Sequence, residues 1–193
     1  METAKRKPLV TKTSLIFIFL LLLVIYLSGV VFHHLEMPSW PAMIPMVLFL
    51  VYHMEEKHIP HIMGGSVFGI AQIFFITAFV KATYPVLGLN GAKEIYILVL
   101  VFLIFLLREV IPWFFNNQCF LLFIITGAVN AMPGVNHLQN LLICLIGGSI
   151  LIGLVVGIKK IVYKIGYRDA VKAKMAAAAA AAAASKTTPP QSQ

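Results

Sequence analysis

Charged residues are scarce in this chain. Only 11% of its 193 residues are Asp, Glu, Lys or Arg, whereas an ordinary soluble domain carries about 25%. Hydrophobic residues make up 60% of the chain, and the mean hydropathy is +0.93. These values exclude a soluble globular enzyme, and they exclude a disordered chain because disorder requires low hydrophobicity and high charge. The composition predicts an integral membrane protein with one compact membrane domain.

Cysteines and catalytic motifs are scarce as well. Cys119 and Cys144 are the two cysteines, and each lies inside an apolar run without a CxxC partner or a nearby metal-type His spacing. We expect both to be small core residues rather than metal ligands or disulfide partners. The sequence contains no HExxH motif, no phosphate-binding glycine loop and no Ser/His/Asp set, so no recognised catalytic motif points to an enzyme.

Long apolar runs are what the chain has in abundance. Crossing a membrane takes roughly 20 mostly apolar residues. Six runs meet or approach this length, at 14–32, 37–52, 62–80, 92–111, 118–132 and 138–158. The first is too long for a cleavable signal peptide and has no small-residue cleavage site after it. We predict an all-α, polytopic membrane helix bundle of about six transmembrane helices, with five to seven allowed because the second and fifth runs are short.

Basic residues gather at the two ends of the chain. Their positions predict a tail at 1–13, a transmembrane domain at 14–158 and a second tail at 159–193. The tails hold 11 of the 15 basic residues and two of the seven acidic ones, which gives them +9, so the whole excess behind the net charge of +8 lies in the tails. Basic residues favour the cytoplasmic side, which predicts cytoplasmic termini, an even number of spans and attraction to anionic headgroups. A nucleic-acid partner is not expected. The second tail includes an alanine run at 176–184, which favours a helical extension before an end expected to be disordered.

Small residues spaced four apart line two of the predicted spans and indicate close helix packing. They are Gly65 and Gly69 in the third span and Ser149, Gly153 and Gly157 in the sixth. They predict either a static packing seam or a seam that slides during transport. The string Gly-Gly-Ser occurs at 64–66 and again at 147–149, which is compatible with a 3+3 inverted repeat.

A dense polar cluster follows the second span, on the predicted cytoplasmic side. It contains His53, Glu55, Glu56, His58 and His61. Imidazole and carboxylate groups suit a divalent metal, for which His53, Glu56, His58 and His61 are the candidates. A pH-sensitive gate and a solvated loop are the alternatives, and Pro60 makes one continuous helix through the cluster unfavourable.

Two ionisable residues, Arg108 and Glu109, interrupt the end of the fourth run. Ionisable groups at membrane depth are costly and indicate function, although Arg108 is also placed to extend toward the cytoplasmic interface. The hypothesis is an inward-facing polar site that includes Glu109, Glu56 and His53.

A second polar group is predicted on the outer side, where it would line a vestibule or form ordinary interfacial loops. Its members are His33, His34, Glu36, Asn130, His137 and Asn140. Pro133 and Gly134 favour a turn within it.

These features favour a small transporter, channel or solute-binding membrane subunit. A non-catalytic assembly subunit of a membrane complex is the first alternative, and a homo-oligomer is compatible with either. An intramembrane hydrolase using Glu55, Glu56, His61 and His137 is the second alternative, although these residues are predicted on opposite sides of a core of about 30 Å. The sequence identifies no cofactor, substrate or ion.

The layout also resembles a small bacterial inner-membrane family of unknown function. The resemblance covers 39–163 and rests on a set of landmarks: Ser39-Trp40, Gly65, Gly69, Pro133-Gly134, Gly153 and Gly157. It implies a multi-pass protein of the bacterial plasma membrane, with an organelle membrane as the alternative, and it implies no activity.

Overall fold

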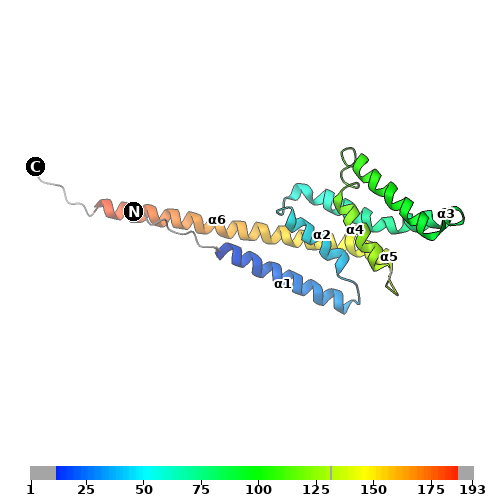
Figure 1. Ribbon diagram of the computed structural model, residues 1–193. Helices are drawn as coiled ribbons and strands as arrows, with labels where there is room; N and C mark the ends of the chain where they lie inside the picture. Colours follow the sequence, from blue (N-terminus) through cyan, green and yellow to red (C-terminus); the bar gives the residue numbers. More distant parts are fainter. Residues whose placement is uncertain (1–11, 131, 187–193) are drawn as a thin grey trace, which may run out of the picture. The chain divides into compact units, whose positions relative to one another are not determined.

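The structure is a computed structural model that describes residues 12–130 and 132–186 (Figure 1). Its elements are α1 (Lys12–His34), α2 (Trp40–Val51), the 3-10 helix η1 (Glu56–His58), α3 (Ile59–Leu107), α4 (Asn117–Val129), α5 (His137–Leu142), the π-helical turn η2 (Ile143–Gly147) and α6 (Gly148–Lys186). The described residues contain helices and no strand, so the predicted all-α class is confirmed. The lysines and arginine of 5–7 and the polar end at 187–193 lie outside the described residues.

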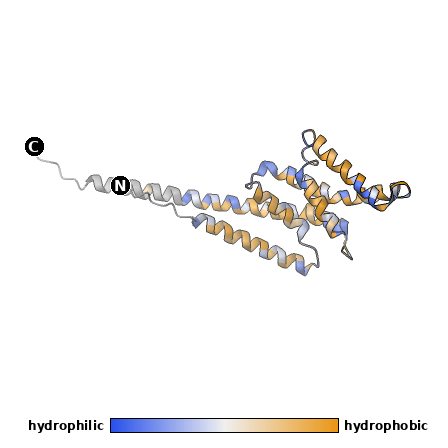
Figure 2. Ribbon diagram, in the orientation of Figure 1, coloured by the Kyte–Doolittle hydropathy of each residue, from blue (hydrophilic) through white to orange (hydrophobic). Residues whose placement is uncertain are grey.

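Among the described residues, three helical segments are long and apolar enough to cross a membrane: Lys12–His34, Glu56–Leu107 and His137–Arg168. This supports a membrane protein. The two shorter apolar helices, α2 and α4, have 12 and 13 residues, which is about 18 to 20 Å of rise. Figure 2 shows apolar residues along α2, α3 and α4, with hydrophilic residues near the start of α3 and around its bend.

The long helix α3 bends back on itself at Gly88. Gly88 has φ 67° and ψ 175°, a region that residues with a Cβ almost never occupy. The hydroxyl of Tyr96 donates a 2.5 Å hydrogen bond to Gln72, whereas a straight helix would separate these residues by about 36 Å. The helix therefore consists of a first limb (59–87) and a second limb (89–107) that run back along each other (Figure 1). The predicted runs 62–80 and 92–111 begin on different limbs, and the second continues into the turn after α3.

The contacts divide the chain into two compact units, 1–25 with 157–193, and 26–156. In the first unit, the start of α1 meets α6, where Thr13 lies 3.4 Å from the position of a Cβ on Gly166. No described residue of α1 is buried. Helix α6 runs through the alanine stretch to Lys186, so the described part of that stretch extends the last helix.

In the part of the second unit that the structure describes, two buried clusters meet at α4. The first joins the second limb of α3 to α4 through Leu100, Ile104, Cys119 and Phe123. The second joins the first limb of α3, α4 and η2 through Ile70, Leu122 and Cys144, with Trp40, Ile44 and Leu48 of α2 packed against it. Helix α4 is therefore the element around which this unit is built.

Glycines bring the first limb of α3 and the segment 113–122 into close contact. A Cβ on Gly65 would overlap the Asn116 amide, and a Cβ on Gly69 would overlap the carbonyl of Cys119. The surroundings of Gly153 and Gly157 are different, because no described atom lies within 4 Å of where their Cβ atoms would stand. Ser149 donates its hydroxyl to the carbonyl of Leu145 within its own helix.

Candidate functional site

The polar cluster after α2 begins with the residues that end this helix. His53 and Met54 have φ values of 54° and 57°, and their N–H groups donate to the carbonyls of Leu50 and Phe49, each at 3.0 Å. This is the hydrogen-bond pattern of a Schellman C-cap, in which glycine is usual at the position of His53. The same pattern ends α1, where Glu36 has φ 52° and Glu36 and Met37 donate to His33 and Phe32. His53 and Glu36 therefore have a structural role in ending a helix.

Glu55 forms an exposed ion-pair group with its neighbours. Its carboxylate lies 2.6 Å from the Lys57 ammonium and 3.4 Å from Nε2 of His58. The hydrogen bond and positive charge of Lys57 hold the pKa of the Glu55 carboxyl below its ordinary value, with smaller contributions from His58 and His53. Glu55 thus carries its negative charge into the exposed turn, where it is balanced by Lys57.

Asn116 connects the start of α3 to the start of α4. Its Oδ1 accepts from the N–H of Cys119 at 3.0 Å, which makes it the N-cap of α4. Its Nδ2 donates to the carbonyls of His61 at 2.9 Å and Pro112 at 2.8 Å. Nδ1 of His61 lies 3.3 Å from the same Pro112 carbonyl, and since a carbonyl only accepts, Nδ1 is the donor. One amide therefore joins three backbone segments, and the His61 imidazole bonds one of the same carbonyls.

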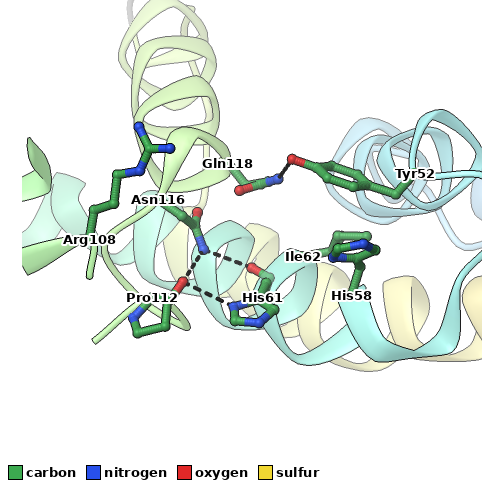
Figure 3. A pocket seen from close by; sticks show the side chains of 8 residues that line it. All are labelled: Tyr52, His58, His61, Ile62, Arg108, Pro112, Asn116 and Gln118. Atoms are coloured by element: carbon green, nitrogen blue, oxygen red, sulfur yellow. Dashed lines mark hydrogen bonds between the residues drawn. The ribbon is translucent and has the colours of Figure 1, made fainter. Parts of the chain in front are cut away.

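Gln118 and Tyr52 form the opposite wall of this region. Nε2 of Gln118 donates to the hydroxyl of Tyr52 at 2.6 Å, and Gln118 is buried. The Tyr52 ring packs on the His58 ring, with the ring centroids 4.8 Å apart. The end of α2 is thereby held against the first turn of α4 (Figure 3).

These groups enclose a pocket of about 160 Å³, which we name the α3–α4 pocket. Its lining residues are Tyr52, His58, His61, Ile62, Arg108, Pro112, Asn116 and Gln118. Figure 3 shows Arg108 and Gln118 on either side of Asn116, with the His61 ring next to Pro112. Arg108, the C-cap of α3, is exposed. The pocket can offer a ligand a guanidinium, imidazoles, amides and a phenol hydroxyl.

No protein-family model, curated protein or solved structure matches this chain. The resemblance to a bacterial inner-membrane family therefore stays a prediction.

The structure brings together some of the predicted inward-facing residues and leaves others apart. His58, His61 and Arg108 line the α3–α4 pocket, whereas His53, Glu55, Glu56 and Glu109 are not among its lining residues. Within 12–130 and 132–186, no three His, Cys, Asp or Glu side chains are placed to hold a metal ion. The lining residues of the pocket include hydrogen-bonding side chains such as those of Tyr52, Asn116 and Gln118.

The predicted outer group is likewise brought together only in part. Nε2 of His137 lies 2.6 Å from Oδ1 of Asn130, and the His137 ring meets Phe74 edge-on at 6.3 Å. Asn140 is 1% exposed and lies in the interior. His33, His34 and Glu36 are exposed at the end of α1. The hydrogen-bonded core of this group is the pair Asn130 and His137.

The positions of His61 and His137 bear on the hydrolase alternative. His61 lies in the first turn of α3, whereas Phe74, the neighbour of His137, lies 13 positions later on the same limb, about 20 Å along the helix axis. Glu55 precedes the start of that limb. The structure therefore keeps the glutamates near the start of the first limb, whereas His137 lies beside its middle.

Sequence reasoning missed the three other polar side chains of the pocket, those of Tyr52, Asn116 and Gln118. Asn116 carried a usable signal, because an Asn directly before an apolar helix is a typical N-cap. Gln118 was a polar residue at the start of a predicted span, which is a weaker signal. Nothing in the sequence pairs Tyr52 with Gln118, since 66 positions separate them.

Proposed function

We propose that this protein is a multi-pass membrane protein that binds a small polar solute in the α3–α4 pocket. It acts as a transporter or as the solute-binding subunit of one. It has six spans formed by α1, α2, the two limbs of α3, α4, and α5 with the following η2 and α6. Both termini and the pocket lie on the cytoplasmic side. The observation that carries the proposal is the convergence of polar side chains from three separated segments on one pocket.

The arrangement of the connecting segments supports this topology. The turn at 52–58 and the turn at 108–116 both contribute to the α3–α4 pocket, so they lie at the same end of the second unit. In a six-span chain with alternating direction, the second and fourth connections fall on the same side of the membrane. The basic residues of the tails favour that side being the cytoplasm.

The short helices also suit a binding site at the membrane boundary. At about 18 to 20 Å, α2 and α4 are shorter than the hydrocarbon core of about 30 Å. Their ends at Tyr52 and Asn117 leave room at this depth for the polar pocket. Irregular backbone at membrane depth is tolerated where it lines a cavity, and short or broken helices at binding sites are common in transporters.

The test is solute retention by the purified full-length protein, measured by native mass spectrometry. Gln118→Leu removes the amide that bonds Tyr52 while keeping the side chain a similar size. Gln139→Leu is the matched control, since Gln139 is not among the pocket-lining residues. We expect a small-molecule adduct on the wild type and on Gln139→Leu, and a loss of at least half of it on Gln118→Leu. An adduct equally abundant on all three proteins would contradict the proposal.

The exposed apolar surface of α1 favours a second candidate function, that of an assembly subunit of a membrane complex. None of the described residues of α1 is buried, and Phe19 and Tyr26 are 68% and 69% exposed. A partner helix is one way to cover such a surface. The same mass spectra distinguish the two candidate functions. An assembly subunit should co-purify with a partner protein chain in a fixed ratio, and that chain should be lost in Phe19→Ser but retained in Gln118→Leu.

A further inference from the structure

We propose that the ligand of the α3–α4 pocket is an oxyanion, a phosphate or carboxylate group. This inference rests on the proposed function, because it names the chemical class that the same pocket takes. The lining residues include one permanent cation, Arg108, and no Asp or Glu. A partly open site with one cation and no carboxylate favours a negative ligand over a positive one.

Arg108 is the principal donor. Its guanidinium carries five N–H groups in a planar fork that matches a phosphate or carboxylate. Within 12–130 and 132–186, no hydrogen bond or ion pair engages this guanidinium. Its backbone ends α3, where the N–H donates to the carbonyl of Ile104 at 3.1 Å. The helix therefore fixes the backbone of Arg108, and the guanidinium is available to bind a ligand.

The first turn of α4 adds a second set of donors next to Arg108. Helix α4 has 13 residues, and its first N–H groups have no carbonyl partner within the helix. Asn116 caps the N–H of Cys119, which leaves the N–H groups of Asn117 and Gln118 as the unpaired donors of that turn. A helix N-terminus carries a partial positive charge, and Gln118 of this first turn is one of the residues that line the pocket.

The nearby acidic residues do not compete for these donors. Glu55 is paired with Lys57 at 2.6 Å in the exposed turn and also faces His58 at 3.4 Å. Glu109 is exposed and lies outside the lining set. The Pro112 carbonyl already accepts from Asn116 and His61. No carboxylate among the lining residues therefore competes with a ligand for the Arg108 guanidinium.

The size of the pocket limits what it can hold. Its volume of about 160 Å³ is smaller than the roughly 300 to 1,000 Å³ of pockets for drug-sized ligands. It suits a single phosphate or carboxylate group. A free solute can supply that group from the cytoplasm, and a lipid can supply it as a headgroup, because the pocket lies at the proposed membrane boundary.

The experiment uses the full-length protein in nanodiscs and two matched substitutions. Arg108→Gln removes the pocket cation, and Arg168→Gln removes an exposed arginine of α6. Arg108→Lys is a third variant that keeps the charge and loses the fork. One arm titrates inorganic phosphate into phosphatidylcholine nanodiscs by calorimetry. The other compares phosphatidic acid with phosphatidylcholine retained in native mass spectra. Circular dichroism checks that each variant keeps its helical content.

We expect wild type and Arg168→Gln to bind one phosphate group with equal affinity. Arg108→Gln should bind phosphate at least about ten-fold more weakly, because it loses a hydrogen bond to a charged group. The affinity of Arg108→Lys should lie between those of the wild type and Arg108→Gln. Binding in the calorimetric arm assigns a soluble phosphate. Binding confined to the lipid arm assigns a headgroup.

Three outcomes overturn the inference. In the first, neither arm detects binding; in the second, binding is equally weakened in Arg108→Gln and Arg168→Gln, which would indicate only general charge attraction. In the third, a neutral solute is lost on Gln118→Leu but retained by Arg108→Gln. The third result leaves the proposed solute-binding function intact and contradicts only the anionic class.

Discussion

Asn116 is the residue on which the geometry of the pocket depends most. It caps α4, binds the carbonyl of His61 and binds the carbonyl of Pro112. The missing Cβ of Gly65 provides the space for its amide. A small residue on one helix therefore makes a polar N-cap on another possible, and this pairing sets how closely the two elements approach.

Gly65→Ala tests this close approach. The added methyl would overlap the Asn116 amide, so we expect a loss of about 1 to 3 kcal/mol in the free energy of unfolding, typical of overpacking. Gly153→Ala is the matched control, because no described atom lies within 4 Å of its added methyl. It should be neutral or slightly stabilising, since alanine favours helix. Unfolding in mixed detergent micelles measures both variants, and equal effects would refute the packing role of Gly65.

Lys57→Met tests the electrostatics of the exposed turn. In the wild type, the Lys57 ammonium lowers the pKa of Glu55. The ion pair therefore stabilises the folded state at pH values above the unfolded-state pKa of Glu55. That contribution is lost as the pH falls through the lower folded-state value. Removing Lys57 should move the Glu55 pKa up toward its ordinary value, as followed by carboxyl carbon NMR.

Lys93→Met provides the control for this titration. Lys93 is an exposed lysine on the second limb of α3, and it is not among the groups that shift Glu55. Its replacement should leave the Glu55 titration unchanged. If Lys57→Met and the wild type titrate alike, the ion pair does not persist in solution.

At the scale of elements, the reversal of α3 creates the conditions for the pocket. It returns the second limb along the first, and the hydrogen bond between Tyr96 and Gln72 holds the two together. Arg108, at the end of the second limb, thereby reaches the pocket that His61 lines from the start of the first limb. The position of the bend determines which ends of the two limbs meet.

Gly88→Ala tests the reversal. The φ of 67° with ψ of 175° at this position is accessible almost only to glycine, and forcing another residue into it costs on the order of 1 to 3 kcal/mol. Gly91→Ala lies within the second limb, where its methyl would meet only Leu87 at 3.8 Å. We expect Gly88→Ala to lower the free energy of unfolding and Gly91→Ala to leave it within about 0.5 kcal/mol. A greater loss in Gly91→Ala would contradict this view of the bend.

Much of the element map could be predicted from the sequence, since apolar runs and the length needed to cross a membrane are local properties. The runs at 62–80 and 92–111 fall on different limbs even though their backbone forms one long helical segment. The bend itself was missed, because glycine inside an apolar run does not reveal its φ. The π-helical turn at 143–147 was missed for a similar reason, as it arises where α5 continues into α6.

The candidate site could be predicted only in part. His58, His61 and Arg108 were found because polar residues next to spans are conspicuous in so apolar a chain. Their partners Asn116 and Gln118 were not, because the bonds to His61 and Tyr52 join positions 55 and 66 apart. His53 and Glu36 were assigned possible chemistry although they end helices. A positive φ at such residues is not visible in the sequence.

At the scale of the whole molecule, the six-span topology makes a prediction about which connecting segments share a side of the membrane. Single cysteines at Lys57→Cys and Glu109→Cys should be labelled by an impermeant maleimide only from the cytoplasm. His34→Cys and Met132→Cys should be labelled only from outside. All four positions are exposed, whereas the native Cys119 and Cys144 are buried, so the wild-type protein gives the background.

The side from which Lys57→Cys and Glu109→Cys are labelled tests the topology and the pocket together. Lys57 and Glu109 lie in the two turns that contribute to the α3–α4 pocket, so both must be labelled from the same side if that pocket exists in the membrane. Labelling of both from outside would reverse the orientation but keep the pocket. Labelling of one from each side would contradict the six-span topology and the pocket together, because a thickness of about 30 Å would then separate their turns.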